Sequence, residues 1–343
     1  MKKSSIVVSL FFMFLASALI AQEKHPAVIY MEQVSVVHKD ISKRTWNYLS
    51  TAANSKNLRK INNKRLKLVK TISDARKEVS KMDSYDGSTV YRDAVVKFLD
   101  INETVMNEDF GKLMDMEEVS EQSYDAMEAY FLAKDIANQK LQDAGDELTA
   151  SEKKFAENNG ITLTESESDL GKKIKAASEV FGYHREIYLI FFKAFKQEAY
   201  LITAMGGKDI AAIEQNKNAL IKTSKEGVEA LNEKEAFKGN KLLIYECKKV
   251  LDFYIKEAEN DIKLLTDFLI ENEKIGKAQK TLEKNKKRTQ KDVDTFNKMV
   301  NEVNAKSQKV NQQMEKSNSK RSQLIDGWNN SVLQFTSKYV PKN

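Results

Sequence analysis

The chain has 343 residues, with 56 lysines and arginines against 50 aspartates and glutamates, and a formal net charge of +6. It contains one cysteine, three histidines and two prolines. A single cysteine excludes an intramolecular disulfide, and so few histidines and cysteines exclude a zinc site built mainly from those two ligands. The near absence of proline permits long, uninterrupted helices.

Residues 1–21 have the pattern of a secretory signal peptide. Lys2 and Lys3 precede an apolar stretch from Ile6 to Ile20, and Ala21 is small enough to stand before a cleavage site. We therefore predict that residues 1–21 are a signal peptide and that the mature protein is exported to the periplasm or the cell surface. No later stretch approaches the roughly 20 apolar residues that a membrane-spanning helix needs.

The most informative feature of the sequence is an internal repeat. When the sequence is shifted by 152 residues, Asn57–Asp115 aligns with Asp209–Asp267 without a gap, and eleven of the 59 pairs are identical. A repeat of this length corresponds to a domain rather than to a solenoid unit. We therefore predict two tandem bundles of similar design.

The predicted elements of the first repeat are four helices with apolar residues at helical spacing. A turn at residues 84–88 contains Gly87, which we expect to cap the second helix with a positive φ. The helices are expected at Ile29–Ala53, Leu58–Met82, from Thr89 through Leu113, and at Glu118–Glu157.

The second repeat follows a linker at residues 158–164 and has the same plan. Its first two helices are expected at Ser168–Ala204 and Asp209–Lys234, with Gly239 as the equivalent cap, and long helices continue to about Tyr339. The fold class is therefore all-α: two tandem, duplicated antiparallel helical bundles with long helices. We expect the first to cover residues 22–160 and the second, with long basic C-terminal helices, residues 161–343.

The last helix has a heptad pattern, with alternating spacings of three and four residues between apolar positions. Two interpretations remain open for it: an ordinary amphipathic bundle helix, which we favour, and an intermolecular coiled coil. The pattern comprises Val293, Phe296, Val300, Val303, Ser307, Val310 and Met314.

Charge is unevenly distributed along the chain. Residues 100–150 contain fourteen acidic residues and three lysines, whereas residues 274–321 contain fourteen basic and five acidic residues. The densest basic cluster, which we name the basic segment, could bind an anionic envelope polymer or could simply be a solvated helix face. The basic segment consists of Lys284, Lys286, Lys287, Arg288 and Lys291.

The motifs of common enzyme classes are missing. Neither His25, His38 nor His184 stands three residues after a glutamate, so the Glu-x-x-His motif of di-iron bundles is not present. Gly-x-Ser-x-Gly and phosphate-binding glycine loops are also missing. Cys247 lies in an apolar helical pattern, which is typical of a buried, unreactive thiol. We therefore predict a protein that is not an enzyme, with no catalytic, metal-binding or cofactor-binding residues.

An aromatic cluster in the first helix of the second repeat has two interpretations. Aromatic residues at helical spacing usually form the core of a bundle. The alternative is a site between these helices for a small apolar ligand, which would make the protein a periplasmic sensor or carrier. The cluster comprises Phe181, Tyr183, Tyr188, Phe191, Phe192, Phe195 and Tyr200.

The signal peptide, the duplicated unit and the segments Tyr124–Tyr130 and Ile187–Lys193 together resemble the leptospiral-type family of bacterial surface proteins. This resemblance implies export and a helical protein at the surface or in the periplasm, and it supplies no catalytic residues. The function we predict is that of a structural or interaction module with an envelope or protein partner. Nucleic acid is not an expected partner of an exported chain whose basic segment lacks interleaved aromatic residues.

Overall fold

The structure is a computed structural model that describes residues 25–55, 57–163 and 168–342. The predicted all-α fold is confirmed, because these residues form helices and the turns between them, without a strand. None of the helices described is both long and apolar enough to cross a membrane. The predicted signal peptide, residues 1–21, lies outside the described residues.

The chain divides into two compact units. The first unit reaches His184 and also includes the C-terminal segment from Leu333, and the second unit spans Arg185–Val332. The division therefore falls inside two long helices, α6 (Asp169–Gly207) and α10 (Gln290–Tyr339), and not in the linker near residue 160 where the sequence suggested it.

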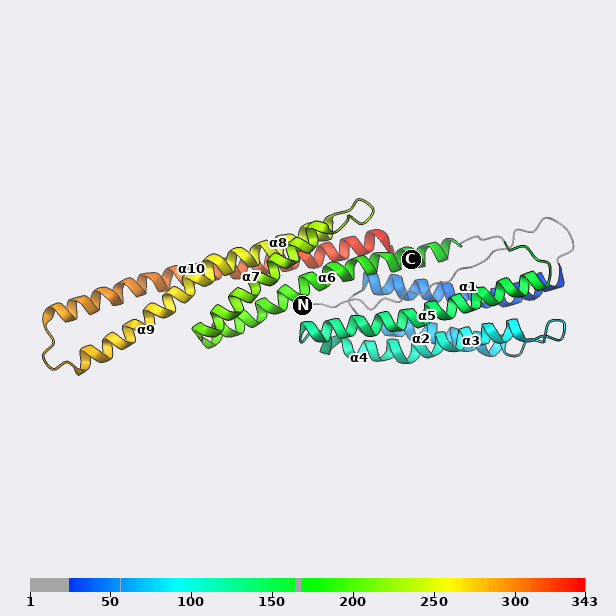
Figure 1. The fold of residues 1–343 in the computed structure, drawn as a ribbon, viewed down its shortest axis with the longest axis horizontal. Helices are drawn as coiled ribbons and strands as arrows, with labels where there is room; N and C mark the ends of the chain where they lie inside the picture. The colour runs from blue at the N-terminus through cyan, green and yellow to red at the C-terminus, as the bar shows by residue number, and fades with distance from the viewer. Residues whose placement is uncertain (1–24, 56, 164–167, 343) are drawn as a thin grey trace. The chain divides into compact units, whose positions relative to one another are not determined.

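In the first unit, long helices lie side by side (Figure 1). A π-helix, η1, interrupts the expected third helix and separates α3 from α4. The elements are α1 (Pro26–Asn54), α2 (Leu58–Val79), α3 (Val90–Thr104), η1 (Val105–Asp109), α4 (Phe110–Ser120) and α5 (Tyr124–Asn158). Leu49, Leu68, Leu99 and Phe110 are fully buried between them, as the helical spacing of apolar residues requires.

The second unit is built from α7 (Ile210–Glu233), α8 (Leu242–Lys256), η2 (Glu257–Ile262) and α9 (Lys263–Lys284), together with parts of α6 and α10. Phe191 and Phe192 of α6 are buried in its core, and Phe191 stacks on Trp328 of α10 with ring centroids 4.6 Å apart. In Figure 1, α9 and the first part of α10 form a two-helix hairpin that extends beyond the junction of α6 and α7. We name this hairpin the arm.

Local structure recurs at the 152-residue spacing of the sequence repeat. The side chains of Asn57 and Asp209 both cap the N-terminus of a helix, by accepting hydrogen bonds from backbone N–H groups at 3.0 and 3.1 Å. The helices α3 and α8 begin at equivalent positions, and the π-helices η1 and η2 follow them at the same place. The two repeats therefore share the positions where these helices begin and the positions where a π-helix interrupts them.

The two turn glycines have the positive φ that was expected, +74° at Gly87 and +80° at Gly239. They are not helix caps, however, because α2 ends at Val79 and α7 at Glu233, well before these glycines. Each lies instead in a tight turn that is closed by a pair of backbone hydrogen bonds, Tyr85 with Ser88 and Phe237 with Asn240. The preceding residues, Asp86 and Lys238, also have a positive φ, so these turns need two successive left-handed residues.

Candidate functional site

The basic segment lies in the turn at the end of the arm. Lys284 is the last residue of α9, Lys291 belongs to the first turn of α10, and the other three residues lie at the turn between the helices. All five side chains are exposed, and the structure gives none of them a carboxylate partner among the residues it describes. The segment is therefore a cluster of cations at a helix–helix turn, and not a stripe along one helix face.

Two local motifs shape this turn. The Asn285 side chain accepts a hydrogen bond from the Lys287 backbone N–H at 3.0 Å. Thr289 and Asp292 form a reciprocal cap at the start of α10, in which the Thr289 N–H donates to the Asp292 carboxylate at 2.8 Å and the Asp292 N–H donates to the Thr289 hydroxyl at 3.3 Å. Such a capping box satisfies backbone donors that a helix start leaves free, so the turn has a defined geometry.

The arm has almost no hydrophobic core. Thr266 and Leu269 are the buried residues of α9, and no residue between Leu269 and Val303 is buried. Heptad positions from Val293 to Val300 are only half-buried, whereas Val303 and Val310 are buried. The arm beyond Leu269 therefore gains little from the burial of apolar surface.

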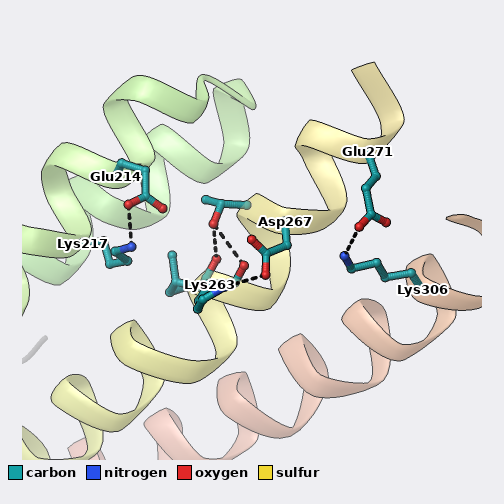
Figure 2. Close-up of polar contacts among 8 residues, drawn as sticks. Glu214, Lys217, Lys263, Asp267, Glu271 and Lys306 are labelled. Carbon is teal, nitrogen blue, oxygen red and sulfur yellow. Dashed lines mark hydrogen bonds and ion pairs between the residues drawn. The ribbon is translucent and has the colours of Figure 1, made fainter. Parts of the chain in front are cut away.

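Several ion pairs lie near the base of the arm, where α7, α9 and α10 approach one another (Figure 2). Lys306 of α10 lies 2.7 Å from Glu271 of α9, and Lys263 lies 2.8 Å from Asp267 one turn along α9. Partly exposed pairs of this kind contribute at most about 1 kcal/mol each. Of the two, the Glu271–Lys306 pair is the one that joins two helices across the arm.

A buried charge cluster lies deeper in the second unit. The Arg321 guanidinium of α10 forms ion pairs with two carboxylates, Glu198 of α6 and Glu257 of η2. Glu198 is 3% exposed and Glu257 is 2% exposed. Buried acids are rarely left unpaired, and here one guanidinium serves both.

The cluster continues along α10 as a polar ladder. Ser317 donates a hydrogen bond to the Asp261 carboxylate at 2.6 Å, and Gln313 donates to its other oxygen at 3.0 Å. Gln313, Ser317 and Arg321 are spaced by four residues, so they follow one face of α10. Glu257 and Asp261 occupy the facing π-helix η2 with the same spacing. These contacts fix the register of α10 against η2.

Burial determines the electrostatics of the cluster. It raises the pKa of Glu257 to about 7, against the opposing effect of Arg321, and it raises the pKa of Glu198 to about 6. One oxygen of Glu257 and the hydroxyl of the neighbouring Tyr254 have no hydrogen-bond partner among the described residues. The cluster therefore holds an excess of acid over base, and it retains a proton more strongly than isolated carboxyl groups do.

In the first unit, an arginine side chain contacts the π-helix η1. The Arg65 guanidinium of α2 donates to the backbone carbonyls of Met106 and Asn107 in η1, at 2.6 and 3.1 Å. A π-helix disturbs the regular pattern of backbone hydrogen bonds, and the guanidinium supplies donors at that place. The two π-helices thus have arginine partners from different helices, α2 for η1 and α10 for η2.

The aromatic cluster and Cys247, which the sequence also indicated, lie partly in the interior of the second unit. Phe191 and Phe192 are core residues, as predicted, while Phe195 is half-buried and Tyr200 is 45% exposed. Cys247 is fully buried, and this burial raises the pKa of its thiol. Among the described residues, no group of three histidines, cysteines or acids is placed to hold a metal ion.

The buried cluster was not predicted from the sequence, although a signal for it exists. The heptad spacing of α10 continues past Met314 to Ser317, Arg321, Leu324 and Trp328. An arginine at a position whose neighbours in the pattern are buried predicts a buried cation, and a buried cation needs a carboxylate partner.

Comparison with known proteins gives no relative for this chain. No protein-family model matches it, and neither a curated protein nor a solved structure does. The resemblance to the leptospiral-type surface proteins therefore stays a prediction.

Proposed function

We propose that this protein is a non-enzymatic, exported interaction module of the periplasm or cell surface, and that its basic segment binds an anionic polymer of the envelope. The observation that carries the proposal is the position of the basic segment: five exposed cations without carboxylate partners among the described residues, at the end of the arm. Export rests on the signal-peptide pattern of residues 1–21 and on the family resemblance.

Electrostatics supports an anionic partner. Clustered cations of one sign create a local positive potential, which attracts polyanions and speeds their association. If the segment served only solubility, interspersed acids would do equally well, yet the ion pairs of the arm involve Lys263, Lys298 and Lys306 and no residue of the basic segment. The basic segment is left without such neutralisation.

The contacts that hold α10 at the base of the arm also support binding by the basic segment. The ladder from Gln313 to Arg321 fixes α10 against η2, so the turn between α9 and α10 starts from an anchored helix. A defined turn on an anchored helix presents its charges with less loss of conformational entropy on binding than a flexible tail would.

The test compares two five-residue variants for cosedimentation with isolated cell envelopes at low and high salt. In the first variant, each residue of the basic segment is replaced by glutamine. The control variant replaces five exposed cations of the first unit, so that the change in net charge is equal. The control residues are Lys39, Lys43, Arg44, Lys67 and Lys81.

We expect the wild type and the control to bind envelopes at low salt and to be released at high salt, since the Debye length falls from about 10 Å at 0.1 M to about 3 Å at 1 M. The basic-segment variant should fail to bind at low salt. Equal binding by the two variants would refute the proposal.

The alternative function is a carrier of a small apolar ligand between the helices of the second repeat. Its predicted site, the aromatic cluster, includes Phe191 stacked on Trp328 and Tyr188 stacked on Phe192, with centroids 4.6 and 5.6 Å apart. Rings packed in this way occupy the space that a ligand would need, and so this packing favours the interaction module.

A further inference from the structure

A second cationic feature lies in the first unit, where a pocket of about 350 Å³ opens between the end of α1, the start of α2 and the C-terminal segment. Pockets of this size hold small molecules. The lining consists of Asn47, Ser50, Thr51, Asn54, Ser55, Lys60, Lys64 and Lys342. Three of these eight residues are cations and the other five are small polar residues, so the pocket contains no acid and no large apolar side chain among the described residues.

Hydrogen bonds hold the C-terminal segment at this pocket. The Ser50 hydroxyl donates to the Pro341 carbonyl at 2.9 Å, and the Asn54 amide donates to the Val340 carbonyl at 2.8 Å. Ser337 donates to the Asn54 side-chain oxygen at 2.8 Å. These bonds determine where Lys342 lies, although it is distant in sequence from the other lining residues.

The polar side chains on α1 follow one face of that helix. Asn47, Ser50, Thr51 and Asn54 have the spacing of three and four residues that places side chains on the same side. In a bundle such a face is usually apolar, and Ser50 is only 4% exposed. The hydroxyls of Ser50 and Thr51 and the amide of Asn54 already donate hydrogen bonds within the chain, so the three lysines are the charged donors that the pocket offers to a ligand.

The cations on α2 complete the pocket. Lys60 and Lys64 are one turn apart at the start of α2, where the N-terminal end of the helix itself favours a negative charge. The structure gives Lys60, Lys64 and Lys342 no carboxylate partner within the part of the chain that it describes. The three lysines that line this pocket carry like charges, and a ligand with two negative charges would offset them.

We propose that this pocket binds a small phosphorylated molecule, with Lys60, Lys64 and Lys342 contacting its phosphate. This site is separate from the basic segment, because it lies in the first unit and is concave, whereas the basic segment is an exposed turn. It would give the protein a small-molecule ligand in addition to its envelope partner.

The test measures binding of inorganic phosphate and of glycerol 3-phosphate to the intact chain by isothermal titration calorimetry, in sodium chloride that keeps the ionic strength constant. One variant carries Lys60→Gln and Lys64→Gln, and a second carries Lys342→Gln, which removes a cation beyond the last helix and so spares the fold. The matched control carries Lys67→Gln and Lys77→Gln, two exposed residues of the same helix α2.

We expect the wild type and the control to bind glycerol 3-phosphate, and both pocket variants to bind it at least about tenfold more weakly. Tighter binding of glycerol 3-phosphate than of inorganic phosphate would show that the pocket also holds the organic part, and equal binding would show that it recognises the phosphate alone. The proposal is overturned if the wild type binds neither probe, or if the control loses as much affinity as the pocket variants. A loss in the double variant without a loss in Lys342→Gln would remove the C-terminal segment from the site.

Discussion

Arg321 and Glu257 form an ion pair that joins α10 to the first residue of the π-helix η2. The same guanidinium holds Glu198 of α6, so a single side chain connects three elements of the second unit. The arm begins next to this connection, because α9 follows η2 directly. These ion pairs therefore join α10 and α6 to the element from which the arm begins.

Replacement of Arg321 by alanine should lower the free energy of unfolding by about 3 kcal/mol, because removal of one partner leaves buried carboxyl groups uncompensated. Urea denaturation followed by circular dichroism measures the change. Lys320→Ala is the matched control, since Lys320 is the exposed neighbour on the same helix, and it should change the free energy by less than about 0.5 kcal/mol. Equal effects of the two substitutions would show that the cluster contributes no specific stability.

The raised pKa of Glu257 predicts a pH dependence of stability. Its pKa rises from an ordinary 4.5 to about 7 through burial, so the folded protein binds the proton more strongly than the unfolded chain does. The contribution is complete below about pH 4.5 and is lost as the pH rises through 7. Glu257→Gln, which mimics the protonated acid, should remove this loss, which amounts to at most about 3 kcal/mol.

The measurement is the urea midpoint of the wild type and of Glu257→Gln between pH 5 and pH 8. The two proteins are compared because other groups also change the stability with pH. Burial lowers the pKa of His38 and His184 to about 4 in both proteins. These histidines act in the opposite direction, and their contribution is lost as the pH falls from 6.5 towards 4. If the urea midpoints of the two proteins change with pH by the same amount from pH 5 to pH 8, the pKa of Glu257 is not raised on folding.

The helices were predictable from the sequence because their apolar residues recur at helical spacing and few prolines interrupt them. Leu68 and Leu220 occupy equivalent buried positions of the repeat, and both were visible in the alignment of the chain with itself. The expected third helix is broken at Val105, however, because a π-helix accommodates an extra residue without a change in composition. Sequence periodicity gives no separate signal for such an insertion.

The candidate sites were harder to predict. The charge pattern identifies the basic segment, but its place in a turn depends on Asn285 and on the Thr289–Asp292 capping box, which the charge pattern does not reveal. The phosphate pocket depends on Lys342, which reaches the start of α2 only through tertiary contacts of the C-terminal segment. No local pattern places residues that are so far apart in sequence beside each other.

The turn glycines provide a third prediction. Gly87→Val should lower the free energy of unfolding by about 1–2 kcal/mol, and Gly239→Val should have a similar effect, because a β-branched residue is poorly tolerated at a φ of +74° or +80°. A Cβ added at either glycine would meet no atom within 4 Å beyond its chain neighbours, so the cost comes from the backbone alone. Gly87→Asn, which tolerates this φ better, should recover most of the loss in the same denaturation assay.

Gly227 supplies the last prediction, since it is buried in α7 for reasons of space. A Cβ there would lie 2.8 Å from a terminal methyl of Leu251 and 3.0 Å from a methyl of Ile190. Gly227→Ala should therefore lower the free energy of unfolding by a net amount of about 1 kcal/mol, because the cost of overpacking exceeds the gain in helix propensity.

Gly182, a helical glycine of α6 with no atom near its Cβ position, is the matched control. Gly182→Ala should raise the free energy of unfolding by about 0.5–1 kcal/mol. If both substitutions stabilise the protein, α7 does not pack against α6 and α8 as closely as Gly227 implies.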